Sequence, residues 1–207
     1  MKENIFEIKS GKSHVGYGFL AEGYFLTAVH ILSGNDNCFV NINGKIIEFS
    51  KVKPAFVGRG NNNDPNFVDI AFFKFNDIEG GLLVSDYTPQ KDEVFESICI
   101  KKTKDQKTGN SGDESEIELA YSLGEVEGNY FHCKCNRHHG SSGSPLLKDN
   151  HVIGIMHGGR KVKELLDEGR LSEKEKDFYS LNDDDILCSF LKIGVFMGLK
   201  ERIENNY

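Results

Sequence analysis

The sequence is poor in several features that mark particular classes of protein. Its 207 residues include no Trp and only four Pro, and 32 acidic residues against 25 basic ones give a formal net charge of −7. A nucleic-acid binder shows a basic stripe, so this balance argues against nucleic acid and, more weakly, against an anionic membrane. No apolar run is long enough to cross a membrane, and the start, MKENIFEIKSGKS, lacks the apolar core of a signal peptide. We expect neither a nucleic-acid nor a membrane partner.

Cysteine is scarce and unevenly placed. The five cysteines are Cys38, Cys99, Cys133, Cys135 and Cys188. An odd number at scattered spacing predicts a reduced chain in the cytoplasm rather than a disulfide scaffold.

The stretch FHCKCNRHH (131–139) gathers two cysteines and three histidines. Its C-x-C spacing is not that of a zinc finger, and no second cysteine pair follows. We interpret it as an alternating strand and expect no metal or other cofactor, with a metal site as the alternative.

Bulky apolar residues are plentiful, since the chain has 15 Phe and 7 Tyr among 38% hydrophobic residues. Most of them fall in short runs separated by turn residues such as Glu22-Gly23 and Asn43-Gly44, a pattern typical of an all-β barrel or sandwich. We expect strands within residues 17–32, 37–52, 67–75, 94–102, 117–135 and 144–159. Residues 103–116 are polar and predict a solvated loop.

Helical patterns appear only late, near residues 161–180 and 199–206. Ser172 with Glu175 forms the S-x-x-E pattern of a capping box, which predicts a short helix within a partly helical insertion at 160–190. Val162, Leu165 and Leu166 are the candidates for a modest apolar face before that helix.

Three short stretches carry candidate catalytic chemistry. They are LTAVHIL with His30, VDIAFFKF with Asp69 and GSSGSPLL with Ser142. A neutral imidazole can take the proton of a serine hydroxyl, and a carboxylate behind the imidazole fixes its tautomer. Each residue also has an ordinary interpretation, as a core histidine, a turn former and a hairpin loop. Asp64 is the alternative carboxylate.

Together these stretches resemble the trypsin-like (chymotrypsin-fold) serine proteases. TAVH, DIAFFKF, GSSGSPLL, VIGIMHGG and KIGVFMGLKERIENNY are similar to that family's signatures and occur in its order. The style is closest to the HtrA-type, glutamyl-endopeptidase and viral branches. The chain departs from the digestive enzymes at Ile31, where they have cysteine, and at Ser141, where they have an acidic residue. It also has no I-V-G-G activation sequence, so the resemblance implies no switch by a freed N-terminus.

The resemblance implies two antiparallel six-stranded barrels that form one peptidase domain. Residues 1–85 would carry His30 and Asp69, and residues 86–207 would carry Ser142 and a C-terminal helix. It also implies a serine endopeptidase that works through an acyl-enzyme intermediate, with an oxyanion hole formed by the N–H groups of Gly140 and Ser142. We expect intracellular processing or activation of a specific protein. A catalytically silent peptide-binding module is the alternative.

Substrate would bind as an extended strand beside residues 156–159, where Gly158 and Gly159 leave space for its backbone. By position in the family, the residues at the pocket for the P1 side chain (the residue before the cleaved bond) are Asn136, Arg137, Met156 and Gly194. Arg137, helped by His157, would receive an acidic side chain. Alternation along the strand instead turns His157 away from the pocket and toward Asp69.

Two questions stay open at the sequence level. The acidic run Asp183, Asp184 and Asp185 would favour a basic P1 side chain if the insertion folded back. The insertion at 160–190 follows the expected substrate strand directly, so it is either a rim or docking element for a regulatory partner or a decoration without function.

Overall fold

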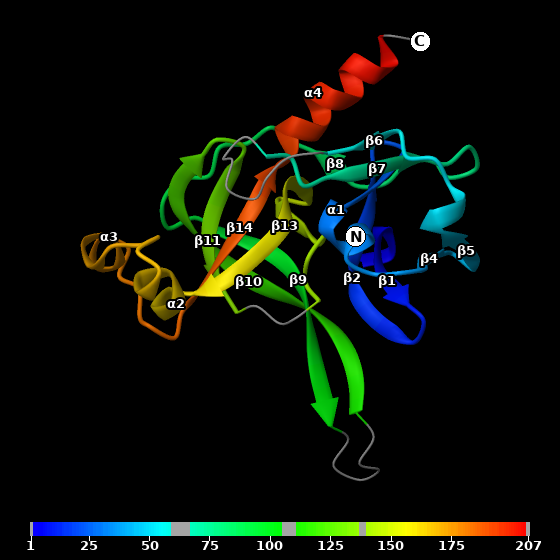
Figure 1. The fold of residues 1–207 in the computed structure, drawn as a ribbon. Helices are drawn as coiled ribbons and strands as arrows, with labels where there is room; N and C mark the ends of the chain where they lie inside the picture. The colour runs from blue at the N-terminus through cyan, green and yellow to red at the C-terminus, as the bar shows by residue number, and fades with distance from the viewer. Residues whose placement is uncertain (1, 59–66, 105–110, 137–139, 206–207) are drawn as a thin grey trace.

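The computed structural model describes residues 2–58, 67–104, 111–136 and 140–205. It has two β-sheets side by side, with one longer helix at the C-terminal end of the chain (Figure 1). No helix in these four ranges has the length and apolar character to span a membrane.

The first sheet takes its seven strands from the N-terminal part of the chain. Their order is β5-β4-β1-β2-β3-β7-β6. Two-residue turns join β2 to β3 and β4 to β5. They are possible because Glu22 and Gly23, like Asn43 and Gly44, have the positive φ values that tight hairpins need. The strands are β1 (Ile5–Ser10), β2 (Ser13–Ala21), β3 (Tyr24–Thr27), β4 (Cys38–Ile42), β5 (Lys45–Glu48), β6 (Phe56–Val57) and β7 (Ala71–Lys74).

The second sheet also has seven strands, in the order β12-β9-β10-β11-β14-β13-β8. Because β12 also pairs with β13, six of these strands close into a barrel, and β8 runs parallel to β13 outside the ring. The strands are β8 (Leu83–Val84), β9 (Val94–Lys104), β10 (Ser111–Glu127), β11 (Tyr130–Cys135), β12 (Pro145–Lys148), β13 (His151–Lys161) and β14 (Ile186–Lys192).

This architecture confirms the expected double β-barrel fold, with one difference between its halves. The second ring is closed, whereas within the described ranges the end strands β5 and β6 of the first sheet do not pair with each other. The first half is therefore a half-barrel. The short strand β8 precedes residue 85 yet pairs with the second sheet, so the two sheets divide the chain between β7 and β8.

A shared core joins the two halves. Phe19 and Phe72 of the first sheet pack in one buried cluster with Ile155 and Leu191 of the second. Phe196 of the C-terminal helix α4 (Ile193–Glu204) completes the cluster and meets the ring of Phe72 edge-on at 5.2 Å. Burial of this aliphatic and aromatic surface stabilises the junction and holds the two halves together.

The insertion after β13 contains two short helices, α2 (Val162–Asp167) and α3 (Glu173–Phe178). The predicted capping box is present, since Ser172 Oγ accepts from the N–H of Glu175 and the Glu175 carboxylate accepts from the N–H of Ser172. Val162 is buried, and Leu165 and Leu166 pack against its cluster, so the predicted apolar face is confirmed.

The prediction of a loop over residues 103–116 is wrong for most of that segment. Strand β9 runs to Lys104 and β10 starts at Ser111, and the two pair in unbroken register along this arm. Polarity misled the sequence analysis, because a hairpin that extends into solvent needs no apolar side chains to form its backbone ladder.

The prediction of a chain with only thiols is also wrong. Cys135 of β11 and Cys188 of β14, 53 residues apart, form a disulfide. The spacing of the cysteines did not reveal this pair, because only the antiparallel pairing of β11 with β14 makes their side chains neighbours.

Candidate active site

The first sheet brings His30 and Asp69 together through strand pairing. His30 lies in the short helix α1 (Val29–Ser33), just after β3, and Asp69 lies two residues before β7. Because β3 and β7 are antiparallel, with Thr27 opposite Ala71, the end of one strand meets the start of the other. Nδ1 of His30 is 2.6 Å from Oδ2 of Asp69, and the backbone N–H of His30 donates to Oδ1 at 3.1 Å.

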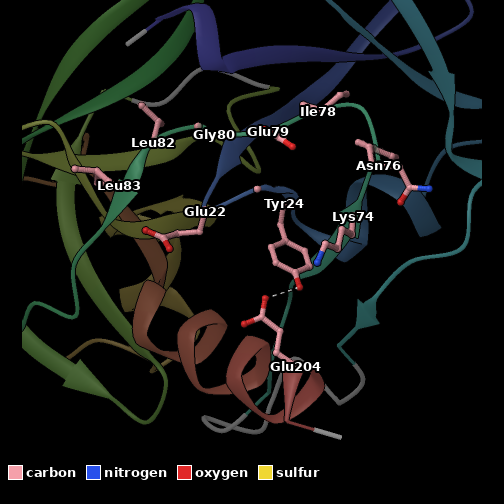
Figure 2. Close-up of a pocket in the computed structure, with 13 residues that line it drawn as sticks. Glu22, Tyr24, Lys74, Asn76, Ile78, Glu79, Gly80, Leu82, Leu83 and Glu204 are labelled. Carbon is pink, nitrogen blue, oxygen red and sulfur yellow. Dashed lines mark hydrogen bonds between the residues drawn. The ribbon is translucent and has the colours of Figure 1, made fainter. Parts of the chain in front are cut away.

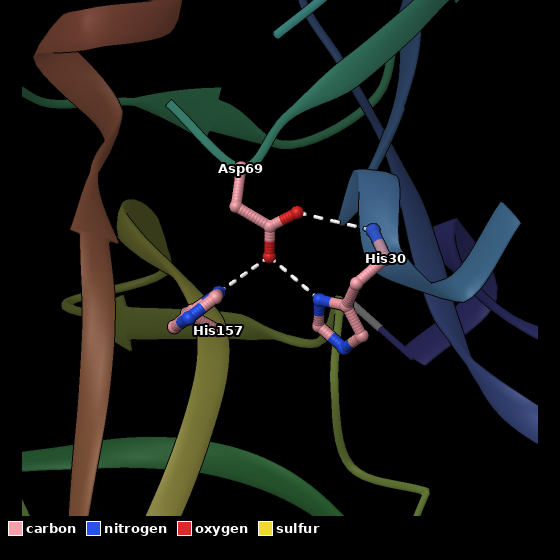
Figure 3. A group of neighbouring side chains, drawn as sticks. All are labelled: His30, Asp69 and His157. Carbon is pink, nitrogen blue, oxygen red and sulfur yellow. Dashed lines mark hydrogen bonds and ion pairs between the residues drawn. The ribbon is translucent and has the colours of Figure 1, made fainter. Parts of the chain in front are cut away.

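A second imidazole shares the same carboxylate. Nδ1 of His157, on β13, is 2.5 Å from Oδ2 of Asp69 (Figure 3). This orientation is the one that alternation along the strand predicted. Since a carboxylate can only accept, each imidazole donates its Nδ1–H. In the neutral tautomer, Nε2 of His30 then keeps a free lone pair, which is what a general base needs.

The environment of Asp69 favours its charged form. Burial, with only 1% of the residue exposed, would by itself raise its pKa. The hydrogen bonds from His157 and His30 outweigh burial and hold the pKa of Asp69 well below its usual range. The N–H of Asp69 also donates to the hydroxyl of Tyr130 at 3.3 Å, and burial raises the pKa of that phenol to about 12, so Tyr130 stays neutral.

The loop that carries Ser142 is held by its backbone. The N–H of Gly143 donates to the carbonyl of Met156, and the N–H of Tyr17, on β2, donates to the carbonyl of Ser142, both at 2.8 Å. Gly143 has a φ of +78°, and a Cβ there would lie 2.1 Å from the carbonyl oxygen of Tyr17. Only glycine fits this position, which explains one glycine of the GSSGSP stretch.

The hydroxyl of Ser142 donates to the carbonyl of His157 at 3.4 Å. No hydrogen bond between Ser142 and His30 occurs in the described part of the chain. The backbone N–H groups of Gly140 and Ser142 have no partner among the described residues either. Two amide donors, a hydroxyl and an imidazole–carboxylate pair thus belong to one region, which is the set of groups that acyl transfer uses.

His14 is a member of this region that the sequence analysis missed. From β2, its Nε2 donates to the carbonyl of Gly140 at 2.8 Å. Its ring is nearly buried beside Tyr17, and its Nδ1 has no hydrogen-bond partner, the carboxylate of Glu7 being 4.0 Å away. No spacing rule could have found His14, because only the packing of β2 against the Ser142 loop gives it a role.

A cavity of about 740 Å³ lies beside the strand expected to bind substrate. Gly158, Gly159 and His157 form one side of it, and residues of the insertion such as Arg170 and Tyr179 form another. His132 and Ser189, which are joined at 3.0 Å, also line it.

Three of the residues predicted for the P1 pocket do not line this cavity. Met156 is buried in the barrel core, because alternation turns it inward, and only its backbone reaches the Ser142 loop. Gly194 lies in the first turn of α4 against the carboxylate of Asp86, away from this cavity. Asn136 is exposed to solvent and does not line the cavity. Arg137 and the alternative carboxylate Asp64 are outside the described residues.

The acidic run of the insertion also lies outside this cavity. Asp183 pairs with Lys176 at 2.5 Å, and Asp185 pairs with Lys134 at 2.9 Å. These ion pairs, with the bidentate Arg160–Glu168 pair, brace the insertion against itself and the barrel. Two of the three carboxylates of the run are therefore engaged in ion pairs with lysines.

Two groups of side chains contain residue types that bind metals. In the 131–139 stretch, Cys135 is in the disulfide and Cys133 is fully buried, where burial raises the pKa of its thiol well above the ordinary value. His30, Asp69 and His157 each offer one ligand atom within 4.8 Å of the others, so this cluster has the donors for a divalent ion. The hydrogen bonds among them already satisfy these same atoms.

A second cavity, of about 570 Å³, lies at the turn between β2 and β3, at the opposite end of β3 from His30 (Figure 2). There the hydroxyl of Tyr24 donates to the carboxylate of Glu204 at 3.0 Å. Burial is the larger cause and the hydrogen bond to Glu204 the smaller one that together raise the pKa of Tyr24 to about 12. The contact fastens the end of α4 to β3. Neither the His30–Asp69 pair nor the Ser142 loop lines this cavity.

No model of a known protein family and no curated protein sequence matches this chain. Solved structures do match it across nearly its whole length. A serine-to-alanine mutant of Rv3671c from M. tuberculosis H37Rv, in its inactive form, has a TM-score of 0.57 at 15% identity, and the match covers 99% of this chain and 88% of that one. A scabies mite inactivated protease paralogue gives 0.62 at 11%, covering 98% and 93%, and the human pathogenic astrovirus serine protease gives 0.52 at 15%, covering 93% and 91%.

At these identities the likeness establishes the fold. The chain has the chymotrypsin fold of the trypsin-like serine proteases.

Proposed function

We propose that this protein is a serine-type endopeptidase with His30, Asp69 and Ser142 as its catalytic triad. The observation that carries the proposal is the His30–Asp69 pair, with Nδ1–Oδ2 at 2.6 Å around a buried, ionised carboxylate. Such a pair fixes the tautomer of the imidazole and stabilises the imidazolium that forms when it accepts a proton.

In the first half of the reaction, the hydroxyl of Ser142 leaves the carbonyl of His157 and turns toward Nε2 of His30. Such contacts are often long before substrate binds. As Oγ bonds to the substrate carbonyl carbon, its proton passes to Nε2, and the carbonyl oxygen becomes an oxyanion facing the N–H groups of Gly140 and Ser142. When the C–N bond breaks, the proton goes to the leaving amine and an acyl-enzyme remains. Water then repeats these steps with His30 as base, releasing the acid and restoring Ser142.

A fluorophosphonate probe tests this proposal directly. We expect the purified protein to be labelled once per chain, at Ser142, and labelling to disappear in Ser142→Ala. Ser10→Ala, which removes a surface hydroxyl of β1, is the control and should label like the original protein. A folded, unlabelled protein would contradict the proposal.

A catalytically silent peptide-binding module is the second candidate. It is favoured by one observation, that the Ser142 hydroxyl points to the carbonyl of His157 rather than to His30. This candidate predicts no labelling, together with peptide binding that Ser142→Ala leaves unchanged.

For the substrate we propose an extended strand along Met156–Gly159. Strand β12 pairs with β13 as far as Ile155, and the N–H and carbonyl of Met156 bond to Ser144 and Gly143 of the serine loop, so the open edge of β13 begins after Met156. An extended peptide can add there through main-chain hydrogen bonds.

We further propose that the 740 Å³ cavity receives the P1 side chain and prefers an acidic one. Arg160 is neutralised by Glu168, whereas Arg170 has no ion-pair partner among the described residues and remains available to a carboxylate. Sequencing of the cuts in a proteome digest should show cleavage after Glu or Asp. Arg170→Ala should weaken that preference, and Lys174→Ala, also in the insertion but outside the cavity, should not. Cuts after Lys or Arg would contradict this assignment.

The cellular setting remains a prediction. Processing of a specific protein in the cytoplasm fits the sequence, but a disulfide such as Cys135–Cys188 is rarely kept in a reducing compartment and argues against that location. For the insertion, we propose that it forms one wall of the cavity. A regulatory partner that binds the insertion would then change how easily substrate reaches the cavity.

A further inference from the structure

A second imidazole on the triad carboxylate takes no part in the proton transfers proposed above. His30, His157 and Asp69 each offer one ligand atom, and these atoms all lie within 4.8 Å of one another (Figure 3). The two Nδ1 atoms are 2.6 and 2.5 Å from the same oxygen, Oδ2 of Asp69. A catalytic triad needs only one imidazole there. The presence of His157 therefore calls for a separate explanation.

The three side chains form a donor set that suits a zinc ion. Zinc binds imidazole nitrogens and carboxylate oxygens, and a site with two histidines and one carboxylate leaves a fourth position for water. The side chain of Asp69 is fully buried. Among the described residues, neither lysine nor arginine pairs with it, so its negative charge is compensated only by the two imidazoles. A cation that replaced their hydrogen bonds would neutralise this charge directly.

The site is open enough for an ion to enter. The side chains of His30 and His157 are 43% and 27% exposed, so solvent reaches the cluster past both rings. Zinc lies about 2.0–2.2 Å from nitrogen and oxygen ligands, which sets those ligands about 3.3 Å apart in a tetrahedron. Each ring would therefore withdraw from Asp69 by less than about 1 Å. His30, the more exposed of the two, can make this shift by turning about its side-chain bonds.

We propose that His30, Asp69 and His157 form an inhibitory zinc site. The ion bonds to Nδ1 of each ring and to Oδ2 of Asp69, and water takes the fourth position. Each ring then carries its proton on Nε2 instead of Nδ1, because an imidazole nitrogen cannot hold a metal and a proton together. No proton is gained or lost overall.

Inhibition follows from the change of tautomer. With a proton on Nε2, His30 has no lone pair to accept the proton of Ser142, so the ion blocks the general base without covering the serine. The ion is an inhibitor and not a cofactor. This consequence rests on the proposed protease function, whereas the binding of zinc does not.

Calorimetric titration with zinc tests the site, and it uses Ser142→Ala so that proteolysis plays no part. We expect one ion per chain to bind with micromolar affinity or tighter. His157→Asn should weaken binding by about 100-fold, since one ligand supplies roughly a quarter of the binding free energy of a four-ligand zinc site. His151→Ala is the matched control, because it removes an imidazole of the same strand that contacts only the carbonyl of Asp149 among the described residues. It should bind zinc like the parent.

Asp69→Asn is the second variant, in case His157→Asn disturbs the fold, and circular dichroism should show that each variant is folded. It keeps the shape of the side chain but removes the charged ligand, so it should also lose zinc. Absence of zinc binding would overturn the proposal. Binding that survives both substitutions, or that His151→Ala weakens equally, would place the ion elsewhere and overturn it too.

Fluorophosphonate labelling tests the inhibition. Zinc should slow the labelling of Ser142 in the original protein, a chelator should restore the rate, and His157→Asn should be insensitive to the ion. Labelling at the full rate with the site occupied would overturn the inhibitory role. If the protein is never labelled, the protease proposal fails, and the titration still decides whether the zinc site exists.

Discussion

The two halves of the molecule contribute different kinds of chemistry to the candidate site. The first sheet supplies His30 and Asp69, whose interaction depends on side-chain charge and hydrogen bonding. The second barrel supplies the Ser142 loop, whose shape depends on backbone hydrogen bonds and on glycines with positive φ. The His30–Asp69 pair is thus sensitive to a substitution that changes side-chain chemistry and keeps the shape. The backbone of the Ser142 loop is sensitive to a substitution that changes the local shape and keeps the catalytic groups.

The halves also differ in how they are held. The second ring is closed by β12–β13 pairing and linked by the Cys135–Cys188 disulfide, whereas the first sheet is open and depends on its aromatic core. A nucleophile loop needs backbone positions correct to a fraction of an ångström, and a closed barrel supplies that rigidity. The following predictions test this contrast.

The largest effect should come from Asp69→Asn. This change keeps the shape but leaves a group that cannot fix the Nδ1–H tautomer of His30, so kcat should fall by about 10⁴-fold with little loss of fold. Steady-state kinetics on a peptide substrate measures it. Asp77→Asn, an exposed carboxylate paired with Lys45, should leave kcat unchanged. An equal loss in both variants would contradict the role of Asp69.

Gly143→Ala makes the complementary change, of shape alone. The new Cβ would meet the carbonyl of Tyr17 at 2.1 Å, and the backbone has a φ of +78°. We expect a loss of about 2–4 kcal/mol in the free energy of unfolding, from overpacking and backbone strain together. Chemical denaturation measures it. Gly169→Ala has a similar φ but open space, so it isolates the strain and should cost about 1 kcal/mol.

His14 links the two halves, so changing it tests how independent they are. Its Nε2–H holds the carbonyl of Gly140, next to a proposed oxyanion donor. His14→Leu should lower kcat on the order of 10²-fold, the loss typical of one oxyanion donor, with KM nearly unchanged. His14→Gln keeps an N–H donor and should recover part of the rate. A matching rise in KM in both variants would mean that His14 serves binding instead.

The smallest effect concerns His157 and appears as a pH dependence of stability. The pKa of Asp69 is lowered in the folded state, so the charged carboxylate stabilises the fold above the ordinary aspartate pKa, and this is lost as pH falls through the lowered pKa. His157→Asn should raise that pKa and cost about 2 kcal/mol at neutral pH. The deficit should shrink as pH falls below about 4. A deficit that is constant down to low pH would instead indicate a packing defect.

Much of the site could be predicted from the sequence because its residues lie within local motifs. His30 follows an apolar strand, Asp69 precedes another, and Ser142 lies between glycines. Each of these patterns can be recognised from the residues on either side of it. The inward turn of Met156 and the outward turn of His157 obey the same alternation. The place of Gly194 in α4 could not be predicted in this way, because the sequence after the last strand does not say whether the chain continues as strand or turns into helix.

By itself the sequence determined the all-β class, the chain order of the three candidate catalytic residues and the capping box of the insertion. These depend on contacts between residues a few positions apart, which periodicity and turn chemistry encode. Only the tertiary structure decided that Cys135 meets Cys188, that His14 holds Gly140 and that the 103–116 segment is mostly strand. Those features arise from pairing between distant strands, where a side chain's partner is chosen by register and not by any neighbour in the chain.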